Sequence, residues 1–127
     1  VAKQCGLAQL INNSSDGYNL HVGERGKFLS GGQRQAVALA RALVHSPAIY
    51  IMDEPTSAMD SAIEGHVKAS IAESVKGKTF ILNTHRMTLL DLVERVIVIE
   101  NGKVIADGKK EEVLPQFKPA AMQRRAK

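Results

Sequence analysis

Two acidic residues, Asp53 and Glu54, follow directly after an apolar run at 48–52. Such a run fits a parallel strand buried on both faces, and α/β sheets bind their ligands beyond the carboxyl ends of such strands. A carboxylate in this position can hold Mg²⁺, usually through water, while the next carboxylate orients or deprotonates an attacking water. We therefore predict Asp53 as a metal ligand and Glu54 as a catalytic residue. The alternative is a plain loop that caps the next helix.

A histidine, His85, stands just after a second apolar run at 79–83. It is the only one of the four histidines that falls at the end of a predicted strand. A histidine at a phosphate site can donate a hydrogen bond to a terminal phosphate oxygen, so we predict His85 as a second catalytic residue. We interpret His21, His45 and His66 as structural.

The third feature is the Ser30-Gly31-Gly32 step at the start of a strong helical pattern. Ser30 and Gln33 have the S-x-x-Q spacing of a capping box. A cap does not explain the two glycines, whereas glycine leaves the first N–H groups of the helix open to a ligand. Because helix N-termini attract anions, the step predicts a phosphate-sized site. A flexible turn is the alternative for such a short segment.

The elements that would position these residues follow the order strand, helix, strand, helix, strand. This order predicts an α/β fold with right-handed crossovers and a hairpin at one edge of the sheet. The strands are predicted at 48–52, 79–83, 96–100 and 103–107, with Asn101-Gly102 as the hairpin turn. Helices are predicted at 2–11, 30–45, 60–77, 87–93 and 110–114.

Composition indicates a globular protein of one domain at most, with 127 residues and no apolar run of membrane-spanning length. The chain shows no signal peptide, and its single cysteine, Cys5, excludes an internal disulfide and fits a small apolar core residue. The net charge of +4 comes from a basic tail, and the rest of the chain is neutral. The few aromatics do not alternate with basic residues, so we expect no nucleic-acid partner. The tail contains Lys118, Arg124, Arg125 and Lys127.

Four segments resemble the motifs of an ABC-transporter nucleotide-binding domain, in that family's order and spacing. They are "LSGGQ" at 29–33 for the signature, "IYIMDEP" at 49–55 for Walker B, "SAMD" at 57–60 for the D-loop and "THR" around His85 for the H-loop. The resemblance runs from about Leu7 to Leu114 and implies ATP and Mg²⁺ as cofactors. It also implies that the signature binds the terminal phosphate of ATP held by the opposite subunit. The residues so assigned are Leu29, Ser30, Gly31, Gly32 and Gln33 in the signature and Ser57 and Asp60 in the D-loop.

The segments around these motifs resemble exporters, and "MDEPTSAMD" and "THRMTLLDLVERVIVIENGKVIADG" are most similar to type I secretion ATPases for RTX-type adhesins or toxins. That resemblance implies a homodimer of nucleotide-binding domains beneath transmembrane domains, at the cytoplasmic face of the inner membrane. A periplasmic adaptor and an outer-membrane channel are further implied partners. Met59 and Asn83 depart mildly from the family pattern, and we expect neither to alter the chemistry.

One family element is absent, because no G-x-x-x-x-G-K-[ST] segment occurs in the chain. The aromatic adenine platform and the glutamine loop are absent as well. We therefore expect the C-terminal part of a P-loop NTPase with a RecA-like parallel sheet. Residues 1–46 would belong to the helical signature subdomain, and residues 47–127 would form the C-terminal half of the ATPase core and the tail.

Two functions remain open on this basis. The chain is either part of the ATP-hydrolysing motor of an exporter or, on its own, a non-catalytic binding or assembly module. A soluble ABC protein of DNA repair or translation fits the signature's flanks less well. In each case we expect an exposed apolar patch where further elements of the domain would pack.

Overall fold

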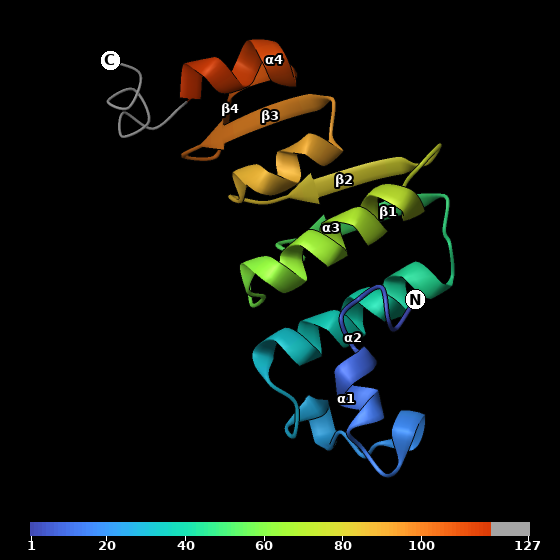
Figure 1. The fold of residues 1–127 in the computed structure, drawn as a ribbon. Coiled ribbons are helices and arrows are strands. Elements are labelled where there is room, and N and C mark those ends of the chain that lie inside the picture. Colours follow the sequence, from blue (N-terminus) through green and yellow to red (C-terminus); the bar gives the residue numbers. More distant parts are fainter. Residues whose placement is uncertain (118–127) are drawn as a thin grey trace, which may run out of the picture. The chain divides into compact units, whose positions relative to one another are not determined.

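The computed structural model describes residues 1–117, which divide into two compact units, Val1–His85 and a second that begins at Arg86. Figure 1 labels the main elements. The helices are α1 (Ala8–Asn12), α2 (Gly31–Val44), α3 (Ser61–Ser74) and α4 (Lys110–Val113), and the strands are β1 (Ile49–Asp53), β2 (Thr79–Asn83), β3 (Arg95–Glu100) and β4 (Lys103–Lys109). The predicted α/β order is confirmed, while the predicted basic tail lies outside the described residues.

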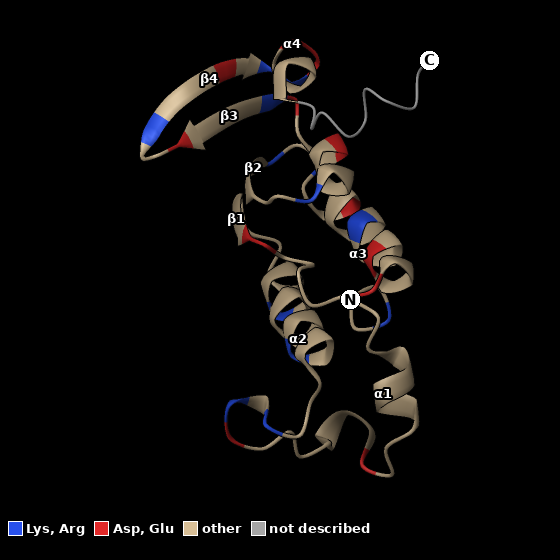
Figure 2. Ribbon diagram, turned by 90° about the vertical axis from the view of Figure 1, so that its left-hand side faces the viewer, with Lys and Arg blue, Asp and Glu red and all other residues tan. Residues whose placement is uncertain are grey.

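The first unit is built around the parallel pair β1–β2. The register places Ile51 opposite Ile81 and Asp53 opposite Asn83, so both strands end at the same level. The crossover between them contains α3, which lies along one face of the pair in Figures 1 and 2. Polar residues that follow the two strands are therefore brought to one edge of the sheet.

Only one face of this strand pair is buried, so the prediction that β1 is buried on both faces was wrong. Tyr50 and Met52 are buried together with Val67 and Ile71 of α3. The alternate residues are open, with exposed fractions of 56% for Ile49, 75% for Ile51 and 53% for Ile81. Successive side chains of a strand point to opposite faces, and within the described first unit α3 covers just one of them. The predicted exposed apolar patch is thus confirmed on the other face.

The helix α2 begins and ends as predicted, after Ser30 and before His45. Its buried residues are Ala36, Leu39 and Leu43, which recur at helical spacing. The opening helix α1 is shorter than predicted, because Gly6 takes a positive φ of 79° and residues before it form turns. Cys5 is fully buried, as predicted, and burial raises the pKa of its thiol.

The start of α3 offers a direct test of local stabilisation. Asp60 Oδ1 accepts hydrogen bonds from the backbone N–H groups of Ala62 at 3.0 Å and Ile63 at 2.9 Å. We expect Asp60→Ala to lower the free energy of unfolding by about 1 kcal/mol, because two donors at the helix start lose their acceptor. Urea unfolding measures this change. Asp60→Asn is the matched control, since its amide oxygen still accepts, and an equal loss in both variants would contradict the capping role.

The second unit contains the predicted hairpin of β3 and β4. Asn101 and Gly102 both have positive φ, at 49° and 73°, as a two-residue turn of this kind requires. Arg95 bonds Asp107 through two parallel contacts of 2.8 and 2.7 Å, which lowers the pKa of Asp107. The hairpin forms a two-stranded sheet of its own, whereas we predicted it at an edge of the parallel sheet.

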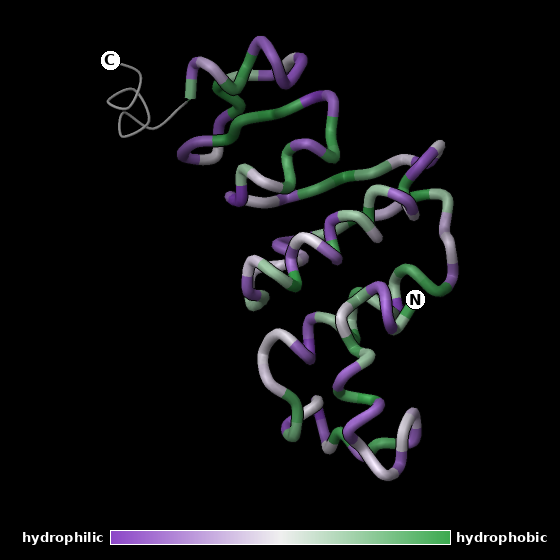
Figure 3. Tube along the Cα trace, in the orientation of Figure 1, coloured by the Kyte–Doolittle hydropathy of each residue, from purple (hydrophilic) through white to green (hydrophobic). Residues whose placement is uncertain are grey.

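Hydrophobic residues lie along β2 and β3 in Figure 3, as the apolar runs predict. The segment Met87–Leu92 is a 3-10 helix, not an α-helix, and α4 is a single turn that ends one residue earlier than predicted. Figure 2 shows acidic and basic residues interspersed along α3. Among residues 1–117, no helix combines the length and the hydropathy that crossing a bilayer requires.

Candidate active site

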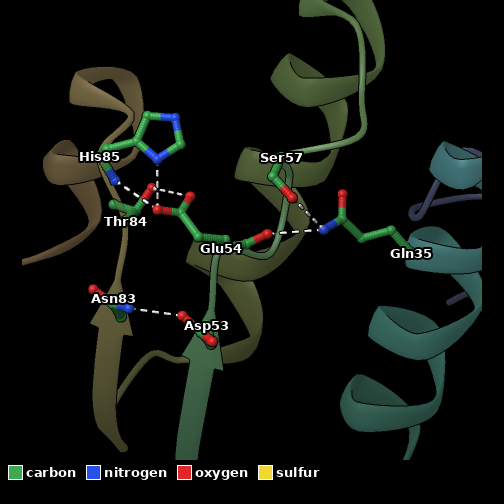
Figure 4. Close-up of polar contacts among 7 residues, drawn as sticks. All are labelled: Gln35, Asp53, Glu54, Ser57, Asn83, Thr84 and His85. Carbon is green, nitrogen blue, oxygen red and sulfur yellow. Dashed lines mark hydrogen bonds and ion pairs between the residues drawn. The ribbon is translucent and has the colours of Figure 1, made fainter.

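The side chain of Glu54 lies at the centre of a hydrogen-bonded cluster beyond β1 and β2 (Figure 4). Its Oε1 accepts from the backbone N–H of His85 at 2.9 Å and lies 2.6 Å from His85 Nδ1. Its Oε2 accepts from Thr84 Oγ1 at 3.2 Å. The structure thus brings the two predicted catalytic residues, Glu54 and His85, into direct contact.

These contacts determine the charge of Glu54. Partial burial acts to raise its pKa, but the hydrogen bonds and charge of His85 and the hydroxyl of Thr84 outweigh burial, so the pKa is lowered. An ionised carboxylate only accepts hydrogen bonds, so the short contact assigns a proton to His85 Nδ1. The imidazole is largely exposed and Glu54 is half-buried. Glu54 is therefore a carboxylate able to take a proton from water, and His85 keeps its second nitrogen for another partner.

Asp53 occupies the position predicted for a metal ligand, exposed at the end of β1. Its Oδ1 accepts from Asn83 Nδ2 at 2.7 Å, which orients the carboxylate and leaves its other lone pairs for a ligand. No cluster of three or more acidic, histidine or cysteine ligands occurs within residues 1–117. This donor set fits Mg²⁺, which often takes one or two carboxylates and completes its shell with water and substrate phosphates.

The capping box predicted for the signature is present. Ser30 Oγ accepts from the Gln33 backbone N–H at 3.2 Å, and Gln33 Oε1 accepts from the Ser30 backbone N–H at 2.8 Å. Leu29 is buried and Ser30 is exposed at the helix start. In the described chain no hydrogen bond joins Ser30 or Gln33 to Asp53, Glu54 or His85. The signature therefore presents a separate surface, and its binding of phosphate stays a prediction.

The loop after β1 packs closely on the start of α2. A Cβ built on Gly32 would lie 2.9 Å from the carbonyl oxygen of Ala58, whereas one on Gly31 would lie 3.6 Å from the Ala58 Cβ. Gln35 reaches the same loop, where it bonds to Glu54 and Ser57 (Figure 4). It also accepts a hydrogen bond from the backbone N–H of Ala58. The second glycine of the signature thus permits a close backbone approach that any side chain would block.

Sequence reasoning missed three residues of this cluster. Asn83 was expected to leave the chemistry unchanged, yet it holds Asp53, and the pairing of the two strand ends was the signal. Thr84 contacts the Glu54 carboxylate directly. Gln35 had no local signal, because its hydrogen-bond partners lie 19 to 23 residues further along the chain. All of these residues lie in the first unit, and the division at 46/47 stays a prediction.

Comparisons with known proteins agree with this arrangement. The family model described as "ABC transporter" matches residues 3–57. The chain is 44% identical over 116 residues to the alpha-hemolysin translocation ATP-binding protein of Escherichia coli, covering 91% of this chain and 16% of that protein. It is 43% identical over 114 residues to the toxin RTX-I translocation ATP-binding protein of Actinobacillus pleuropneumoniae, covering 90% of this chain and 16% of that protein.

A mycobacterial multidrug efflux ATP-binding/permease protein, from Mycobacterium bovis, is 42% identical over 113 residues, which are 89% of this chain and 10% of that protein. Among solved structures, a bacterial Atm1-family ABC exporter with ATP bound superposes with a TM-score of 0.81 at 32% identity, over 99% of this chain and 22% of that chain. The chain therefore spans about a tenth to a sixth of the length of these curated relatives. With its motifs in order and this likeness along nearly its whole length, the chain is similar to the ATP-binding proteins of exporters in the ABC transporter family.

Proposed function

We propose that this chain supplies part of the ATP-hydrolysing machinery of an ABC exporter. The observation that carries the proposal is the ionised Glu54 carboxylate, oriented by His85 and Thr84 beside the Asp53–Asn83 pair. A carboxylate held in this way can orient an attacking water and accept its proton. The ATP-binding relatives also favour hydrolysis over a non-catalytic assembly module.

In this proposal each residue has a distinct part. Glu54 takes the proton of the attacking water, and His85, when doubly protonated, donates from its second nitrogen to an oxygen of the terminal phosphate. Asp53 would hold Mg²⁺ through water, and Asn83 keeps that carboxylate in place. Bound Mg²⁺ would neutralise the developing charge on the phosphate oxygens.

The signature would act on a second ATP molecule, across a homodimer. The exposed Ser30 hydroxyl and the first N–H groups of α2 suit the terminal phosphate of a nucleotide held by another copy of the domain. We assign Leu29, Ser30, Gly31, Gly32 and Gln33 to this role, and Ser57 and Asp60 to the D-loop between the two sites. The proposal assigns no residue of this chain to the α- and β-phosphates, because the sequence contains no phosphate loop.

For the complete protein we propose a type I secretion exporter at the cytoplasmic face of an inner membrane. Its partners would be transmembrane domains, a periplasmic adaptor and an outer-membrane channel. The alpha-hemolysin and RTX-I translocation relatives support a toxin or adhesin of the RTX type as the exported substrate. Small-molecule efflux is the second candidate, supported by the multidrug efflux relative at nearly equal identity.

ATP turnover tests the proposal directly. We expect the complete gene product to hydrolyse ATP with Mg²⁺ and to lose at least about 100-fold of that rate in a chelator, because phosphoryl transfer depends on charge neutralisation. Phosphate release measures both rates. The 127-residue chain alone is expected to be inactive for lack of a phosphate loop. Turnover that persists unchanged in the chelator would contradict the assigned chemistry.

A further inference from the structure

The carboxamide of Gln35 connects α2 to the loop that carries Glu54 (Figure 4). Its Nε2 donates to the backbone carbonyl of Glu54 at 2.8 Å and to Ser57 Oγ at 3.0 Å. Its Oε1 accepts from the backbone N–H of Ala58 at 2.9 Å. Both donors and the acceptor of one amide are thus engaged by three successive parts of the same loop.

This set of partners also fixes the orientation of the amide. A rotation by half a turn would point Oε1 at the Glu54 carbonyl and Nε2 at the Ala58 N–H, so acceptor would face acceptor and donor would face donor. Gln35 can therefore bind this loop in one orientation only.

The backbone of Glu54 is held in an unusual conformation. Its φ is 44°, in the left-handed region that residues other than glycine seldom occupy. Such a conformation persists where surrounding contacts determine it, and it is concentrated at functional sites. The N–H of Glu54 donates to the carbonyl of Asn83 at 2.9 Å, and its C=O accepts from Gln35. Both sides of the residue are therefore fixed, one by β2 and the other by α2.

We propose that Gln35 is a positioning residue that holds the backbone of Glu54 so that its carboxylate meets His85. Because Gln35 lies on the helix that begins at the signature, it also links Ser30–Gln33 mechanically to Glu54. A displacement of the start of α2 is thereby passed to the carboxylate through one side chain. The catalytic part of this inference rests on the proposed function, while the positional part does not.

The test compares Gln35→Met with Arg41→Met. Gln35→Met keeps the length of the side chain and removes all three hydrogen bonds. Arg41→Met is the control, because it introduces methionine at an exposed position of the same helix. A third variant, Gln35→Glu, keeps an acceptor for Ala58 and loses the donors to Glu54 and Ser57. Three quantities are measured: kcat for ATP in the complete gene product, its Kd for ATP, and the hydrogen exchange of the His85 amide, which donates to Glu54 Oε1.

We expect Gln35→Met and Gln35→Glu to lower kcat by about 10- to 100-fold, the effect of misplacing a reacting group, and to leave Kd within about threefold. We expect exchange of the His85 amide to rise at least about tenfold, because its acceptor moves. Arg41→Met should change none of the three quantities.

A merely structural role predicts a different outcome. The melting temperature would then fall, while kcat per folded molecule and exchange at His85 stay at the level of Arg41→Met, and this result would overturn the inference. If the unaltered protein fails to hydrolyse ATP, the proposed function is wrong. Exchange at His85 then decides the inference alone: faster exchange in both Gln35 variants supports it, and unchanged exchange overturns it.

Discussion

Glu54→Gln is expected to lower kcat for ATP hydrolysis by about 10²- to 10⁴-fold, the usual contribution of a general base. The amide has the same size as the carboxylate and still offers an oxygen to the His85 N–H, so the local fold should survive. It cannot accept a proton from water. ATP binding, measured by calorimetry, should therefore change little, and the variant should accumulate with nucleotide bound.

The matched control for this change is Glu111→Gln. Glu111 is an exposed acid of α4 in the second unit, and its replacement removes the same charge while leaving the hydrogen bonds of Glu54 intact. We expect its kcat to equal that of the unaltered protein. If Glu54→Gln hydrolyses ATP at the rate of the unaltered protein, the assignment of Glu54 as the base is wrong.

The same variant has a second readout in the pH dependence of stability. The pKa of Glu54 is lowered in the folded protein, so its ionised form stabilises the fold above the pKa of an unfolded glutamate. That stabilisation is lost as pH falls through the lower, folded pKa. The stability difference between the unaltered protein and Glu54→Gln should therefore shrink with acidification. A difference that is constant from neutral pH into this range would contradict the charge assigned to Glu54.

The residues at strand ends could be predicted from sequence because their placement follows from topology alone. Two apolar runs separated by one helix give a parallel pair, and parallel strands end at a common edge. Asp53 and Asn83 had to lie side by side, as did the segments that follow them. The cap of α2 is local in the same way, since Ser30 and Gln33 are three residues apart.

Other features depend on tertiary geometry that no local pattern contains. The apolar run of β1 predicts burial on both faces, but exposure of Ile51 depends on which elements pack against each face. The left-handed φ of Glu54 has no sequence signal either, because glutamate seldom adopts it. Gln35 reads as an ordinary helix residue, and only the path of the loop after β1 brings its three partners within reach.

The two signature glycines are expected to behave differently when replaced by alanine, although they are neighbours in one helix turn. A Cβ on Gly32 would lie 2.9 Å from the Ala58 carbonyl oxygen, closer than a carbon atom normally comes, whereas a Cβ on Gly31 makes an ordinary contact at 3.6 Å. Gly32→Ala must therefore displace the loop that follows Glu54. We expect it to lower the free energy of unfolding by about 1 to 3 kcal/mol, as overpacking does.

Gly31→Ala serves as the control, because it makes the same gain in helix propensity without the clash. Its stability in urea should be unchanged or slightly higher. The rate of ATP hydrolysis separates the two roles of the glycines. If phosphate binds at the exposed start of the helix, both variants should lose hydrolysis. Gly32→Ala should lose at least about 100-fold, because the loop is misplaced as well. If Gly31→Ala keeps full turnover while Gly32→Ala loses it, close packing on Ala58 explains the second glycine and the open phosphate approach fails for the first.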